Sequence, residues 1–138
     1  MRALVLTLVL VCTLMARPAV VLAGPLNWHE VPASPAGRQW WDEGSLRFNR
    51  DGALTVLSRF QPVEADDLTT TRPRSLGDLY VMQIDCEQNL FRDTSINGIP
   101  RWRSEWHPAD GDALIEAVVQ QSCAAASLLN PTSPTRPA

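Results

Sequence analysis

Cysteine placement constrains the fold of this 138-residue chain more than any other feature of its sequence. Cys86 ends a segment of alternating polar and apolar residues, which is typical of a β-strand, and Cys123 lies in a segment with helical spacing. The third cysteine, Cys12, lies in an N-terminal segment with the features of an export signal. An even number of cysteines in an exported protein favours pairing, so we expect a Cys86–Cys123 disulfide; two separate buried thiols are the alternative.

The N-terminal segment has the three parts of a cleavable signal peptide. Arg2 supplies a positive charge, Ala3–Met15 is an uncharged apolar run, and Val21–Ala23 offers residues that a signal peptidase accepts. The apolar run is shorter than the roughly 20 residues that cross a bilayer. We therefore expect cleavage before Gly24 rather than a retained anchor helix, and no stable membrane anchor afterwards.

Removal of the signal divides the chain into three parts. Residues 1–23 are the signal, residues 24–129 form one domain, and residues 130–138 form a tail rich in Pro, Thr and Ser that we expect to be disordered. The 115 residues that remain after cleavage have the size of a single domain. We expect this domain outside the cytoplasm, in the periplasm first of all, with the thylakoid lumen or the cell surface as alternatives.

The charge and the side-chain chemistry exclude several classes of function. After cleavage the chain has 10 basic residues, all of them arginine, and 15 acidic residues, so its net charge is about −5. This charge argues against nucleic acid or anionic membrane as the main partner. The chain has two isolated histidines, His29 and His107, no Gly-x-Ser-x-Gly motif and no cluster of metal-ligating residues. We therefore expect no catalytic residue, no metal site and no cofactor, and the protein is not expected to be an enzyme.

The clearest local pattern predicts a β-hairpin over Ser45–Phe60. The turn sequence Asn49–Gly52 places glycine where a positive φ is needed. A three-residue loop with a glycine bulge puts Phe48 opposite Leu54, and this register gives the hairpin one apolar face.

The remaining patterns predict an α+β fold. Further strands are expected at Trp28–Val31, Arg38–Asp42, Leu79–Cys86, Leu90–Thr94 and Arg101–Trp106, and Gln61–Gly77 is expected to be a long loop. A helix is expected over Ala113–Leu129, with Asp110 or Asp112 as its cap. Together these elements predict a small antiparallel sheet of about five or six strands with a C-terminal helix packed across it, joined by the disulfide.

Tryptophan supplies the candidate binding residues. Adjacent residues of a strand point to opposite faces, so only one of Trp40 and Trp41 can lie beneath the helix. The other is either covered by a loop or exposed, and exposed tryptophan is enriched at binding hot spots. Trp40 and Trp41 are therefore the candidate partner-binding residues. The other three tryptophans, Trp28, Trp102 and Trp106, are expected to pack in the core and at its rim.

The order of these features resembles the surface-adhesin E-like family of exported bacterial proteins, over about Trp28 to Ala126. The residues that carry the resemblance are Trp40-Trp41-Asp42, Ser45-Leu46-Arg47, the turn at Gly52 with Val56 after it, Asp85-Cys86 and Cys123. The resemblance implies a small antiparallel sheet domain, a disulfide between strand and helix at Cys86 and Cys123, and binding rather than catalysis. Members that bind host matrix proteins use basic and aromatic segments, and because this chain has no matching segment and no lysine, host adhesion is not carried over.

Three classes of function follow from the sequence. The first is an exported interaction or assembly module that binds a protein partner in the envelope through a sheet face. The second is a structural or envelope-maintenance protein with no discrete ligand. A small hydrolase or metal-dependent enzyme is the third and the least supported, because the chain lacks the side chains for it.

Overall fold

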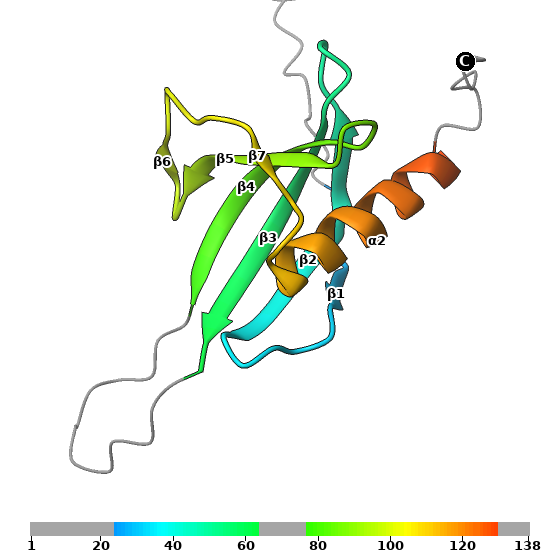
Figure 1. The fold of residues 1–138 in the computed structure, drawn as a ribbon. Helices are drawn as coiled ribbons and strands as arrows, with labels where there is room; N and C mark the ends of the chain where they lie inside the picture. Colours follow the sequence, from blue (N-terminus) through cyan, green and yellow to red (C-terminus); the bar gives the residue numbers. More distant parts are fainter. Residues whose placement is uncertain (1–23, 64–76, 130–138) are drawn as a thin grey trace, which may run out of the picture.

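The computed structural model describes residues 24–63 and 77–129. The expected signal peptide, the expected tail and most of the expected Gln61–Gly77 loop lie outside these described residues. The described part of the chain forms one antiparallel sheet crossed by one helix (Figure 1). This arrangement confirms the predicted α+β architecture.

Seven strands pair in the order β1-β2-β3-β4-β5-β6, and β7 pairs with β5 as well. Their bounds are β1 (Trp28–Glu30), β2 (Gly37–Phe48), β3 (Leu54–Pro62), β4 (Asp78–Asp85), β5 (Leu90–Ile96), β6 (Ile99–Pro100) and β7 (His107–Pro108). Consecutive strands are neighbours along the main path, so the sheet is built from local antiparallel pairings.

The predicted hairpin is formed by β2 and β3 in the predicted register. Phe48 pairs with Leu54, and the N–H of Asn49 donates to the carbonyl oxygen of Ala53 at 2.9 Å. Gly52 has a φ of 84°, which a residue with a side chain rarely adopts, and this explains why glycine ends the turn. The strand expected at Arg38–Asp42 is continuous with the hairpin, because β2 bends at a register shift after Asp42 instead of ending there.

The prediction of a strand at Arg101–Trp106 is wrong, because no strand forms over these residues. A turn at Asn97 and Gly98, with φ values of 51° and 79°, leads into β6, which is only two residues long. Pro100 ends this strand and has no N–H with which to continue the ladder. Pairing with β5 resumes only at β7, so residues 101–106 cross over as an irregular segment.

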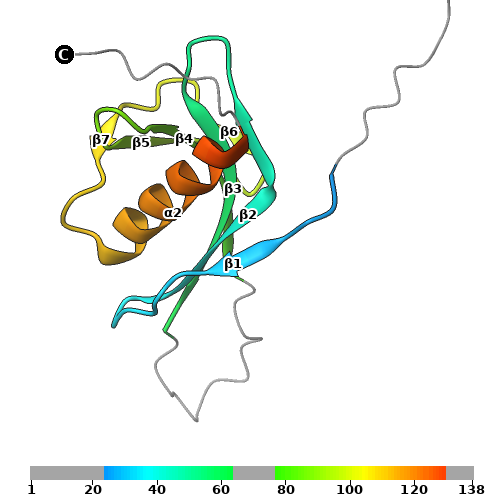
Figure 2. The ribbon, with the colours of Figure 1, turned by 90° about the vertical axis from the view of Figure 1, so that its right-hand side faces the viewer.

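The helix α2 (Ala113–Leu129) has the predicted bounds and covers one face of the sheet (Figure 2). Asp112 is its cap, because its Oδ1 accepts hydrogen bonds from the N–H groups of Leu114 at 3.0 Å and Ile115 at 3.2 Å. The helix and the sheet enclose the core, whose buried residues are Val31, Trp41, Leu54, Val56, Met82, Ile84, Ala109, Leu114, Val118, Val119 and Ala126.

The predicted disulfide is confirmed. Cys86 follows directly after β4, and Cys123 lies in the second half of α2, with 5.8 Å between their Cα atoms. The bond therefore fixes the helix to the end of a central strand in addition to the apolar contacts beneath it.

One polar atom in the core has no partner, and this leads to a prediction. The Oγ of Ser122 is fully buried on the inner side of α2 and makes no hydrogen bond within the described residues. A buried hydroxyl without a partner costs about 1–3 kcal/mol, so Ser122→Ala is expected to raise the free energy of unfolding by about 1 kcal/mol. Urea unfolding measures the difference. The control is Ser127→Ala, at an exposed helix position, which is expected to change little; a less stable Ser122→Ala variant would contradict the prediction.

Candidate functional site

The two adjacent tryptophans of β2 lie on opposite faces of the sheet, as predicted. Trp41 faces the helix and is 4% exposed, its Nε1 donates to Oε1 of Gln121 at 2.9 Å, and the ring of His29 stacks on it at 4.7 Å between centroids. Trp40 is half-buried and points to the face that α2 does not cover. Of the two candidate partner-binding residues, only Trp40 is therefore placed to meet a partner.

We call the sheet face opposite α2 the outer face. Strand registers place on it Trp28 of β1, Arg38, Trp40 and Arg47 of β2, Leu57 and Arg59 of β3, Leu79, Val81 and Gln83 of β4, and Arg92 of β5. All of these side chains are exposed or half-buried. The same registers and the alternation along β4 place Glu30, Asp42 and Asp85 on this face as well, so it combines aromatic and aliphatic groups with four arginines and three carboxylates.

Trp40 lies between two guanidinium groups on the outer face. The Cζ atoms of Arg38 and Arg59 are 4.9 and 5.5 Å from the centre of its ring, which is within the range of cation–π attraction. Glu30 fixes Arg38 by accepting two hydrogen bonds at 2.6 and 2.7 Å. These hydrogen bonds lower the pKa of Glu30 and raise the pKa of Arg38, so both groups stay charged. An exposed ion pair contributes little to stability, but this one holds a cation over the tryptophan ring.

A second arginine–tryptophan pair lies on β5. Arg92 donates from Nε and Nη2 to Oε1 of Gln83 at 2.9 and 2.7 Å, and its Cζ is 4.5 Å from the centre of the Trp106 ring. Trp106 is 37% exposed and Trp102 is 90% exposed. The expectation that Trp102 packs in the core or at its rim is wrong, because this residue lies in the irregular segment after β6 and is almost fully exposed.

Four of the arginines gather on the outer face, although the whole chain has a net charge of −3. Arg38, Arg47, Arg59 and Arg92 lie there among the carboxylates Glu30, Asp42 and Asp85. The sequence alone does not reveal this cluster, because the arginines come from three strands and form no basic segment. The signal that could have shown it is the hairpin register, which places Arg59 opposite Trp40, two residues from Arg38.

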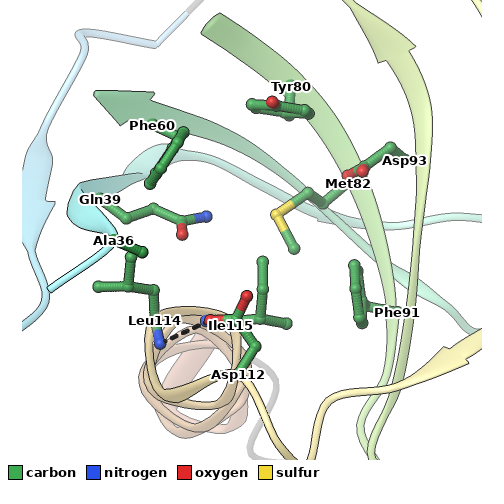
Figure 3. A pocket seen from close by; sticks show the side chains of 10 residues that line it. All are labelled: Ala36, Gln39, Phe60, Tyr80, Met82, Phe91, Asp93, Asp112, Leu114 and Ile115. Carbon is green, nitrogen blue, oxygen red and sulfur yellow. Dashed lines mark hydrogen bonds between the residues drawn. The ribbon is translucent and has the colours of Figure 1, made fainter. Parts of the chain in front are cut away.

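A cavity of about 300 Å³ lies on the other side of the sheet, between its strands and the start of α2 (Figure 3). Its lining residues are Ala36, Gln39, Phe60, Tyr80, Met82, Phe91, Asp93, Asp112, Leu114 and Ile115. Burial raises the pKa of Asp93, and Arg101 and His107 oppose this effect. Burial and the nearby carboxylates of Asp78 and Asp93 raise the pKa of Tyr80.

The two histidines lie apart from this cavity's apolar lining. The Nε2 of His29 is 2.8 Å from Oε2 of Glu43 at the β1 edge, and His107 lies in β7. Within residues 24–63 and 77–129, no group of three or more His, Cys, Asp or Glu side chains could hold a metal ion. No helix of that part of the chain is both long and apolar enough to span a membrane.

The described part of the chain is a small antiparallel sheet crossed by one helix and closed by a disulfide, a kind of bond that persists in oxidising compartments. The model of the Surface adhesin-E family matches residues 29–129. The chain belongs to this family, which confirms the resemblance seen in the sequence. No curated protein and no solved structure matches the chain. The family and the disulfide together indicate an extracytoplasmic or surface protein with an adhesin-like interaction role.

Proposed function

We propose that this protein is an exported interaction module that binds a protein partner of the envelope through its outer face, with Trp40 as the anchor. The observation that carries the proposal is the position of Trp40. It is half-exposed on the face opposite the helix, between the guanidinium groups of Arg38 and Arg59. Membership of an adhesin family supports binding rather than catalysis as the role. The periplasm is the proposed compartment, and the cell surface is the alternative.

The chemistry of the outer face indicates what the partner presents. Tryptophan and arginine are the residues most enriched at binding hot spots, where an anchor often contributes 2 kcal/mol or more. Arg38 and Arg92 are already held in place by Glu30 and Gln83, so binding does not have to order them. Guanidinium groups bind carboxylates in two-point contacts. The fitting partner surface therefore combines carboxylates with an apolar group that covers Trp40.

Replacing Trp40 with serine tests the anchor. We expect the melting temperature to stay nearly unchanged, because Trp40 lies outside the buried core, while capture of the partner from the organism's own envelope fraction falls by about 30-fold or more. Pull-down with the mature protein followed by quantitative mass spectrometry measures capture. A variant that fails to fold would show that Trp40 is structural and would overturn the proposal, as would unchanged capture by a folded variant.

Photo-cross-linking tests whether the partner contacts the outer face or another part of the surface. A photoreactive residue at Leu79, which is exposed on the outer face, is expected to form a covalent adduct with the captured partner. The matched control is the same residue at Gln120, which is exposed on α2, on the other side of the sheet. A stronger adduct from position 120 would place the interface on the helix and contradict the proposal.

A further inference from the structure

We propose that the cavity between the sheet and the start of α2 binds a small amphipathic cation, whose ammonium group pairs with Asp93 and whose hydrocarbon body packs among Phe60, Met82 and Phe91. This site is separate from the outer face, so its failure would leave the proposed partner binding untouched.

The size and the apolar lining of the cavity fit a small ligand. Its volume of about 300 Å³ is at the lower end of the range of small-molecule sites, which is roughly 300–1,000 Å³. In Figure 3 the apolar side chains surround a central space, with Phe60 and Phe91 on opposite sides and Met82 between them. Leu114 and Ile115 close it from the helix. These apolar side chains can bury an aromatic ring or a short alkyl chain.

The charge of the cavity lining indicates the sign of the charge that a ligand would carry. Among the described residues, the charged side chains that line the cavity are Asp93 and Asp112, and no arginine or histidine lines it. Asp112 already accepts the N–H groups of the first helical turn. The carboxylate of Asp93 makes no hydrogen bond and no ion pair within the described part of the chain, and Figure 3 shows this side chain extending from β5 toward Met82. A cationic ligand would supply the partner that this carboxylate lacks.

Arg101 lowers the pKa of the Asp93 carboxyl through its charge but forms no ion pair with it. Asp93 also borders a second hollow of about 220 Å³, which Arg101, Arg103, Ser104, Glu105 and His107 line. Arg101 and His107 act on Asp93 by charge alone, without an ion pair, while burial raises the pKa of its carboxyl. Asp93 is therefore a partly desolvated acid with its oxygens available on the cavity side, and ammonium binding there would restore the lost solvation.

The test compares two ligands of nearly the same size and shape, one with an ammonium group and the other with a neutral hydroxyl group. The probes are 2-phenylethylammonium and the neutral 2-phenylethanol, titrated at pH 7.5 into the mature protein and followed by NMR through the methyl signal of Met82 and by calorimetry. We expect the amine to bind about tenfold more tightly than the alcohol, which is the size of a charge-assisted hydrogen bond. In Asp93→Asn this preference is expected to disappear, while the alcohol binds as before. Asp51→Asn, at the tip of the hairpin, is the matched control and should keep the preference.

A second variant tests, independently of Asp93, whether the probes bind in this cavity. Ala36→Leu places a larger side chain at the wall of the cavity and is expected to weaken both probes, since both need the same space. Equal affinity of the amine and the alcohol for the unaltered protein would overturn the proposal. The absence of binding, or binding that Ala36→Leu leaves unchanged, would also overturn it.

The pH dependence provides a further readout. The groups that face Asp93 are Tyr80 from β4, Asp112 at the helix start, and Arg101, Arg103, Glu105 and His107 from the segment before the helix. As the pH falls through the raised pKa of Asp93, its carboxyl becomes neutral, and the preference for the amine is expected to vanish. Asp93→Asn is the control for this measurement. A pH dependence of the same size in this variant would overturn the role of Asp93.

Discussion

Replacing Trp41 with alanine is expected to lower the free energy of unfolding by about 3–5 kcal/mol, the usual cost of removing a large aromatic side chain from a core. Trp41 is 4% exposed, packs beneath α2 and stacks against His29. Its removal leaves a cavity between β2 and the helix and also frees the side chain of Gln121 from its hydrogen bond. Equilibrium unfolding in urea, followed by far-ultraviolet circular dichroism, measures the loss.

The adjacent tryptophan is the matched control for this experiment. Trp40→Ala removes the same side chain from the neighbouring residue on the opposite face, and we expect a much smaller loss of stability. Trp41→Phe keeps most of the apolar volume but removes the Nε1 donor, so it measures the hydrogen bond to Gln121, at about 1 kcal/mol. Equal losses for Trp40→Ala and Trp41→Ala would contradict the two-faced arrangement of β2.

Removing the disulfide is the second change with a large expected effect. Cys86 and Cys123 are 37 residues apart in sequence, and cross-linking a loop of this length restricts the unfolded chain enough to stabilise the fold by about 4 kcal/mol. Cys86→Ser is expected to lower the free energy of unfolding by this amount and to loosen the attachment of α2. Urea unfolding measures the stability, and hydrogen exchange of the helix amides measures the attachment.

Reduction of the unaltered protein is the control for the cysteine variant. Dithiothreitol should lower the stability of the unaltered protein to about that of Cys86→Ser and leave the variant unchanged. Peptide mapping without reductant should recover Cys86 and Cys123 in one linked fragment. If reductant has no effect on the unaltered protein, the bond contributes nothing to stability.

The parts of the fold that the sequence predicts well are those set by short-range chemistry. The loop Arg50–Gly52 fixes the pairing of Phe48 with Leu54, because only glycine reaches the required φ at the end of the turn. The helical spacing predicts both ends of α2, although choosing between Asp110 and Asp112 as its cap needed the backbone geometry.

The parts that the sequence does not predict depend on contacts between distant segments. Residues 101–106 have strand-like composition, but proline at 100 limits β6, and the next pairing with β5 begins only at His107. Trp102 lies in that irregular segment and is exposed.

The candidate sites were hidden from sequence reasoning for a similar reason. The arginine cluster of the outer face is assembled from strands whose registers must be known before Arg38, Arg59 and Trp40 can be placed together. Asp93 lies on the helix side because it alternates with Phe91 along β5 and pairs with the buried Met82, and this pairing is visible only in the structure. Only the tryptophan pair of β2 carried a signal that alternation along one strand could reveal.

The mixture of charges on the outer face has a consequence for how the protein approaches other surfaces. Arg38, Arg47, Arg59 and Arg92 lie among the carboxylates Glu30, Asp42 and Asp85, so their electric fields partly cancel at a distance. Dissolved ions shorten the range of the remaining field to about 8 Å at physiological ionic strength. The arginines therefore act on a partner only during the last few water layers of approach, where each guanidinium group acts on the charges nearest to it.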